Sequence, residues 1–202
     1  MTEDVRASNI VYLQVIQSKS LAIFLVIFFA SVLSKVYFQQ SWVFDFLFFS
    51  SGYFILYLLF AILANALHER SHIIKIRELG YRALNFKVHR IGDVSFSIEN
   101  MEKMSAEETY QVASAPFLTP SSYITELLSL FILTGVSIIS PFPLVIFLLA
   151  VTGVISISFL GNLCAFIIIQ KRLTSGFCVT LSRTVTSKGD IDEIVAWFQS
   201  SL

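Results

Sequence analysis

Two histidines and a glutamate with metal-binding spacing stand in the segment Leu67-His68-Glu69-Arg70-Ser71-His72. Residues four apart in a helix lie on the same side, one turn above the other, so His68 and His72 can bind one metal ion. Imidazole is a common ligand of zinc, and zinc lowers the pKa of its bound water to about 7. Glu69, between the two histidines, can take a proton from such a water and return it to a leaving amine. These residue types therefore suit metal-assisted hydrolysis.

The same six residues also fit an ordinary amphipathic helix end with two solvated histidines. Their context favours the metal site. The chain has only 3 His, and two of them fall in this pattern. The preceding residues 51–67 are nearly all apolar, which places the pattern at or just inside a membrane boundary. Ionisable groups at such a depth are costly and usually functional.

The composition predicts an integral membrane protein. Of 202 residues, 55% are hydrophobic, 20 are Phe and only 14% are charged. The mean hydropathy is +0.76, and the apolar residues gather in blocks near the roughly 20 residues that a membrane span needs. A net charge of zero gives no indication of nucleic-acid binding. The two cysteines, Cys164 and Cys178, form no disulfide framework.

The elements that must position the site follow from the hydrophobic pattern. We expect a mainly α-helical membrane domain over residues 20–170, between an N-terminal tail (1–19) and a small C-terminal tail (171–202). The second helix should continue without a break through His68 and His72. The four predicted transmembrane helices cover about 20–38, 43–67, 122–140 and 144–170.

A polar segment, residues 73–121, separates the second and third predicted spans. Gly80 is placed to cap the second helix. Alternating residues in 85–91 and 94–98 predict a β-hairpin. A capping box from Ser105 to Glu108 should begin a short helix through Val112. In the C-terminal tail, residues 177–185 suggest a strand or two, and 190–198 an amphipathic helix.

The basic residues predict the orientation. With four spans, both tails and the segment 73–121 share one side of the membrane, and every one of the 14 Lys and Arg except Lys35 belongs to that side. Cytoplasmic loops carry the excess of Lys and Arg. Both termini and the histidine pattern should therefore face the cytoplasm.

A membrane span that delivers His68-Glu69-Arg70-Ser71-His72 at its cytoplasmic end resembles the site-two protease clan of intramembrane zinc metalloproteases. The chain resembles the related zincin peptidase family more closely. The other similar pieces are Ser114-Ala115-Pro116-Phe117, Ile157-Ser158-Phe159-Leu160-Gly161-Asn162-Leu163 and Ser175-Gly176-Phe177-Cys178-Val179. Together the pieces cover most of residues 52–185. The resemblance implies a multi-pass protein of a bacterial cell membrane.

In those relatives the third metal ligand is an acidic residue in the last transmembrane segment. The corresponding position here looks like Asn162, an amide where a carboxylate is expected. A neutral amide oxygen binds zinc more weakly than a carboxylate does. Asn162 is the first choice for the third ligand, Glu126 the second and Cys164 the third. The alternative role of Asn162 is an ordinary interhelical hydrogen bond, which polar residues in membrane helices commonly make.

Two function classes follow. The first is a zinc metalloendopeptidase, with Zn²⁺ held by His68, His72 and Asn162 and with Glu69 as the catalytic acid and base. Its substrate would be a membrane protein or a hydrophobic peptide cut in or near the lipid bilayer. The second is a catalytically silent membrane adaptor or immunity-type protein that keeps the fold with an impaired ligand set.

Overall fold

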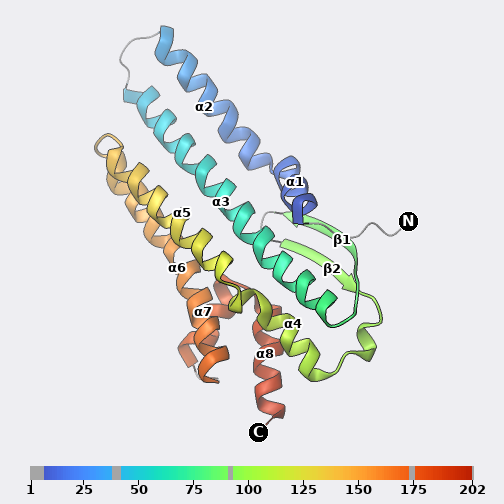
Figure 1. Ribbon diagram of the computed structural model, residues 1–202. Coiled ribbons are helices and arrows are strands. Elements are labelled where there is room, and N and C mark those ends of the chain that lie inside the picture. The colour runs from blue at the N-terminus through green and yellow to red at the C-terminus, as the bar shows by residue number, and fades with distance from the viewer. Residues whose placement is uncertain (1–6, 38–41, 91–92, 173–175, 202) are drawn as a thin grey trace.

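The computed structural model describes residues 7–37, 42–90, 93–172 and 176–201. It is built of helices and one antiparallel hairpin (Figure 1). In chain order the elements are α1 (Ala7–Gln17), α2 (Lys19–Tyr37), α3 (Trp42–Glu78), β1 (Ala83–Arg90), β2 (Asp93–Ile98), the 3₁₀ turn η1 (Met101–Lys103), α4 (Ala106–Leu118), α5 (Pro120–Ile139), α6 (Leu144–Lys171), α7 (Gly176–Val185) and α8 (Lys188–Ser200).

Four helical stretches in the described part of the chain are long and apolar enough to cross a membrane, as the hydrophobic blocks predict. They are Lys19–Tyr37, Trp42–Glu78, Ala106–Ile139 and Leu144–Lys171. The long helix α3 runs without interruption through the histidine pattern, which confirms that one helix carries both histidines.

The long helices lie roughly side by side (Figure 1). α2 packs along α3, and α5 packs against both α3 and α6, whereas α3 and α6 scarcely contact each other. Tyr53 of α3 joins α6 at the far end of the bundle, where its hydroxyl lies 2.8 Å from Thr152 Oγ1. A cavity bounded mainly by α3, α5 and α6 lies between the helices.

The predicted cap ends α3. Gly80 has φ +86°, the left-handed region where glycine avoids strain. Its N–H donates to the Arg77 carbonyl at 3.0 Å, and the Tyr81 N–H donates to the Ile76 carbonyl at 3.0 Å. These two bonds are the Schellman pattern. The chain then turns back as the hairpin β1–β2, which contacts α3, and the ring of Phe96 in β2 lies 6.2 Å from the His72 ring between centroids.

Helix α4 begins with the predicted capping box, since Ser105 and Glu108 each bond the other's backbone N–H. The helix continues through Pro116 to Leu118 instead of ending near Val112. This extension brings α4 alongside the histidine-bearing end of α3.

Residues 177–185, predicted as a strand or two, form the helix α7, so that prediction was wrong. The β-branched residues suggested a strand, but the buried positions Val179 and Ser182 are three apart, one turn of a helix. Ser182 Oγ donates to the Gly161 carbonyl of α6 at 2.8 Å.

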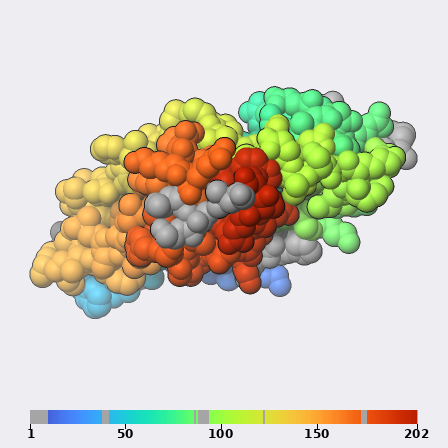
Figure 2. Space-filling model, turned by 90° about the horizontal axis from the view of Figure 1, so that it is seen from below, coloured from blue at the N-terminus to red at the C-terminus, as the bar shows by residue number. Residues whose placement is uncertain are grey.

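Helix α8 confirms the expected amphipathic helix. Its apolar side enters a core shared with α4, α6 and α7, through Ile191, Ile194, Val195 and Phe198. Seen from below, α8 lies between α7 and the ends of α3 and α4 (Figure 2). The C-terminal segment is thus packed against the end of the bundle.

Candidate metal centre

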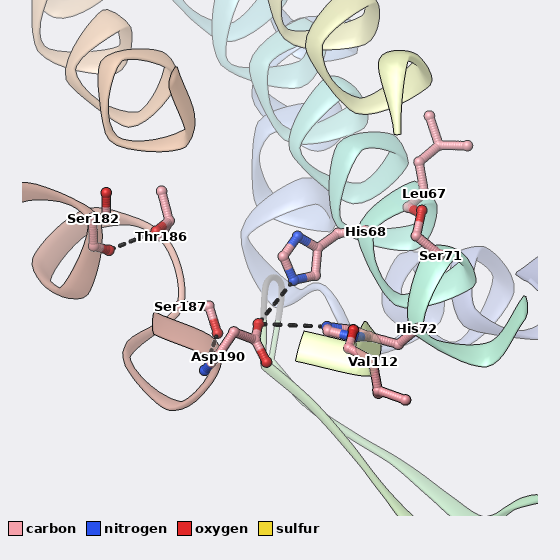
Figure 3. A network of polar contacts seen from close by, with 9 residues as sticks. All are labelled: Leu67, His68, Ser71, His72, Val112, Ser182, Thr186, Ser187 and Asp190. Atoms are coloured by element: carbon pink, nitrogen blue, oxygen red, sulfur yellow. Dashed lines mark hydrogen bonds and ion pairs between the residues drawn. The ribbon is translucent and has the colours of Figure 1, made fainter. Parts of the chain in front are cut away.

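Three side chains from two distant helices meet at the end of α3 (Figure 3). His68 and His72 come from α3 and Asp190 from the first turn of α8. Asp190 Oδ2 lies 3.3 Å from His68 Nε2 and 3.4 Å from His72 Nε2. One ligand atom from each residue falls within 4.8 Å of the other two, so the group could hold a metal ion.

The tautomer of His72 follows from its surroundings. Its Nδ1 lies 2.8 Å from the Val112 carbonyl oxygen, and because a carbonyl can only accept, Nδ1–H must donate. In the neutral ring Nε2 then carries a lone pair directed at Asp190. A lone pair and a carboxylate oxygen repel each other at this range, so a proton or a metal ion is required between them. A histidine ligand fixed by a backbone carbonyl is the usual outer-shell arrangement of metal sites.

The start of α8 positions Asp190. The Asp190 N–H donates to Ser187 Oγ at 3.5 Å, which caps the helix. An ion pair of 2.6 Å between Arg183 and Asp192 joins α7 to α8. Farther along, Trp197 stacks on Tyr110 of α4 with ring centroids 4.1 Å apart. The position of the carboxylate is therefore determined by packing on both sides of α8.

Charge and burial act on Asp190 in opposite directions. Burial alone would raise the pKa of its carboxyl group. The hydrogen bonds and the charges of His68 and His72 outweigh that effect and hold the pKa well below its usual range. Asp190 is therefore a carboxylate at neutral pH, the form that binds metals.

Glu69 lies beside the group without belonging to it. Its side chain is buried, with 9% of the residue exposed. Glu69 lines two cavities, together with Val94 and Ser187. A buried carboxyl group in this position is available for proton transfer next to the metal-binding group.

The larger cavity, of about 680 Å³, extends from His68 and Glu69 along α3 to Tyr57 and is bounded by α5 and α6. The smaller, of about 250 Å³, lies on the other side, between the hairpin, α4 and α8, and includes His72 and Asp190. The candidate metal centre therefore has open space on both sides.

The structure brings His68, Glu69 and His72 together as the spacing predicts. It does not bring Asn162 into the metal-binding group. Asn162 lies in the wall of the larger cavity, where its Nδ2 donates to Glu126 Oε1. Cys164 faces Cys178, with the two Sγ atoms 2.7 Å apart. The third member of the group that could hold a metal ion is Asp190, and not Asn162, Glu126 or Cys164.

Asp190 was missed because no local pattern marks it. It is separated from His68 by 122 residues, and the resemblance directed attention to the last membrane span. The available signal was modest: an acidic residue in the first turn of a predicted amphipathic helix on the same side of the membrane as the histidines.

No family model, curated protein or solved structure matches this chain.

Proposed function

We propose that this protein is a membrane-embedded zinc metallopeptidase. The observation that carries the proposal is the convergence of His68, His72 and Asp190 on one point, with the buried carboxyl of Glu69 beside it. Two imidazoles and one carboxylate, with a further position left open, are a typical ligand set of catalytic zinc.

Two of the three separations between the ligand atoms suit zinc. Tetrahedral ligands at about 2.0–2.1 Å from zinc lie roughly 3.3–3.4 Å from one another. The Nε2–Oδ2 separations of 3.3 and 3.4 Å agree with that value. Zinc would supply a Lewis acid and lower the pKa of a water molecule towards neutrality.

The residues of the chain supply the rest of the chemistry. The Val112 carbonyl fixes the His72 ring, and the packed start of α8 keeps the Asp190 carboxylate in place. Glu69 would accept the proton of the attacking water and pass it to the leaving amine, so that a peptide bond is hydrolysed without a charged amide leaving group.

The larger cavity supports a substrate taken from the membrane. It runs between α3, α5 and α6 inside the apolar part of the bundle, from Tyr57 to the metal-binding group. A single-span protein or a hydrophobic peptide, locally unwound, would enter it with little exposure to water. The distribution of the Lys and Arg residues supports an orientation in which both termini and the site lie on the cytoplasmic side.

The hypothesis of a catalytically silent adaptor depended on Asn162, an amide at the position where a carboxylate ligand was expected. Asp190 supplies a carboxylate at hydrogen-bonding distance from both histidines. The ligand set therefore has no evident deficiency, and the peptidase is the better supported function.

The test compares membrane proteomes of cells that produce the wild type and Glu69→Gln. The glutamine cannot accept the proton, and loss of a general base typically lowers the rate about 10²- to 10⁴-fold. Uncleaved substrates should accumulate in the Glu69→Gln cells. Glu78→Gln, which alters only an exposed ion pair with Lys75 on the same helix, should behave as wild type. Indistinguishable proteomes in all three strains would contradict the peptidase proposal.

A further inference from the structure

Three amide or carboxyl side chains from different helices lie in the wall of the larger cavity, among largely apolar neighbours. They are Asn65 of α3, Glu126 of α5 and Asn162 of α6. Glu126 Oε1 accepts from Asn162 Nδ2. Among the described residues, Glu126 Oε2 and Asn65 Nδ2 are buried and have no hydrogen-bond partner.

These unsatisfied atoms are unusual because of where they lie. Polar groups buried without partners are costly, and in membrane spans they are retained mainly where they line a cavity or a pathway. The packing of the bundle gives them no evident structural task, since the Asn162–Glu126 bond needs only one carboxyl oxygen. The two free atoms point to a ligand that enters the cavity.

The pair of atoms limits the chemistry of that ligand. Asn65 Nδ2 can only donate, so the ligand must offer an acceptor, which an ammonium or guanidinium group lacks. Glu126 Oε2 accepts when the carboxyl is ionised and can donate when it is protonated. An amide offers a donor and an acceptor and satisfies the pair in either state.

We propose that Asn65 and Glu126 form a subsite that binds an amide group of the substrate inside the membrane, either a peptide unit of its backbone or an Asn or Gln side chain. The proposal rests on the proposed function and specifies where its substrate is held.

The subsite is close to the metal centre. Asn65 precedes His68 by three residues, roughly 4.5 Å along the helix axis, and both side chains line the same cavity. An extended substrate advances about 3.3 Å per residue. The bound amide therefore belongs to a residue one or two positions from the bond that is cleaved.

Binding can be measured without cleavage by using full-length Glu69→Gln in lipid nanodiscs. The probes are two fluorescent peptides of about 20 apolar residues, identical except for Asn or Leu at one central position. Each peptide is titrated against the Glu69→Gln parent protein. Each is also titrated against variants of that parent that carry Asn65→Leu, Glu126→Leu or Glu126→Gln in addition. Ser156→Leu is the matched control, a polar residue of α6 outside the cavity lining.

The two sources of the amide give different results. If a side chain is bound, the parent prefers the Asn peptide by about threefold or more, the effect of one hydrogen bond in a membrane, and both leucine variants lose that preference. If a backbone unit is bound, the leucine variants bind both peptides more weakly than the parent does, and by about the same factor. Glu126→Gln, which can still donate and accept, keeps binding in either case and controls for misfolding of Glu126→Leu.

The subsite would be overturned if Asn65→Leu and folded Glu126→Leu bound both peptides as tightly as the parent. Water alone would then satisfy the free hydrogen-bonding atoms of Asn65 and Glu126. This result is independent of catalysis, since absence of cleavage by the wild type would contradict the proposed function and leave the binding comparison valid.

Discussion

Asp190 Oδ2 lies 3.3 Å from His68 Nε2, although 122 residues separate the two in the chain. The contact joins the long membrane helix α3 to the C-terminal helix α8 (Figure 3). A metal ion held there would cross-link a central membrane helix to the C-terminal helix. Metal binding and the docking of α8 should therefore be coupled.

Removal of the metal should loosen α8. A ligand that binds only the docked state stabilises it by about 2.7 kcal/mol at a free concentration 100 times its Kd. With a chelator, trypsin should cut faster at Lys188, which is exposed at the start of α8. Asp190→Asn should be cut at that faster rate with or without zinc. Cleavage of the wild type at the same rate in both conditions would refute the coupling.

Gly161→Ala should disturb the docking of the C-terminal helices. A Cβ there would lie 2.3 Å from Val185 Cγ2 and 3.0 Å from Thr186 Cγ2, just before α8. Overpacking of this kind typically costs about 1–3 kcal/mol. Thermal unfolding in detergent should show a lower midpoint, together with weaker zinc binding.

Gly153→Ala is the matched control, since a Cβ at this position of α6 meets nothing within 4 Å. It should leave zinc affinity unchanged and raise stability by about 0.5–1 kcal/mol, the usual advantage of Ala over Gly in a helix. Equal zinc affinity and equal thermal midpoints in the two variants would show that the close approach at Gly161 is not needed for the docking of the C-terminal helices.

Acidification should release zinc through the histidines and not through Asp190. The pKa of Asp190 is well below its usual range, so that carboxylate stays ionised as the pH falls from neutrality. Zinc competes with protons for His68 and His72, because imidazole binds a metal only in its neutral form. Measured zinc affinity should fall with decreasing pH by at most about a hundredfold per pH unit, the slope for two displaced protons. A loss near a thousandfold would indicate three protons and contradict this assignment.

The charge distribution predicts the sidedness of the membrane domain. In a background without Cys164 and Cys178, Glu102→Cys, after the hairpin, should react only with thiol reagents admitted to the cytoplasm. Phe142→Cys, in the α5–α6 connection and 78% exposed, should react from the opposite side. Gln40, the other connection expected there, lies outside the described residues. Labelling of both cysteines from one side would be incompatible with four spans.

Much of the fold was predictable because its signals are local. Blocks of apolar residues predicted the four long helices, and Gly80 and Ser105 predicted a helix end and a helix start. The segment after Gly176 was harder, because its β-branched residues favour strands in isolation. Its helical form depends on packing against α6, through contacts such as Ser182 to Gly161.

The candidate site likewise combines residues that a local sequence pattern predicts with one residue that no local pattern predicts. Spacing alone brought His68, Glu69 and His72 together, since all three lie within two turns of one helix. Asp190 depends on the docking of α8, which no local pattern encodes. Asn162 showed the expected sequence context but has Glu126 as its partner. Polar residues in membrane helices commonly make such interhelical bonds.

The most direct measurement is the zinc content of purified Asp190→Ala and Asn162→Leu beside the wild type. The wild type should hold close to one zinc per chain, and Asn162→Leu should hold the same amount. Asp190→Ala should lose it, with an affinity decrease beyond the roughly 10- to 100-fold typical of an outer-shell partner. Gln199→Ala, at an exposed position of the same helix, controls for damage to α8. Full zinc in Asp190→Ala with loss in Asn162→Leu would contradict the assignment of Asp190 as the third ligand.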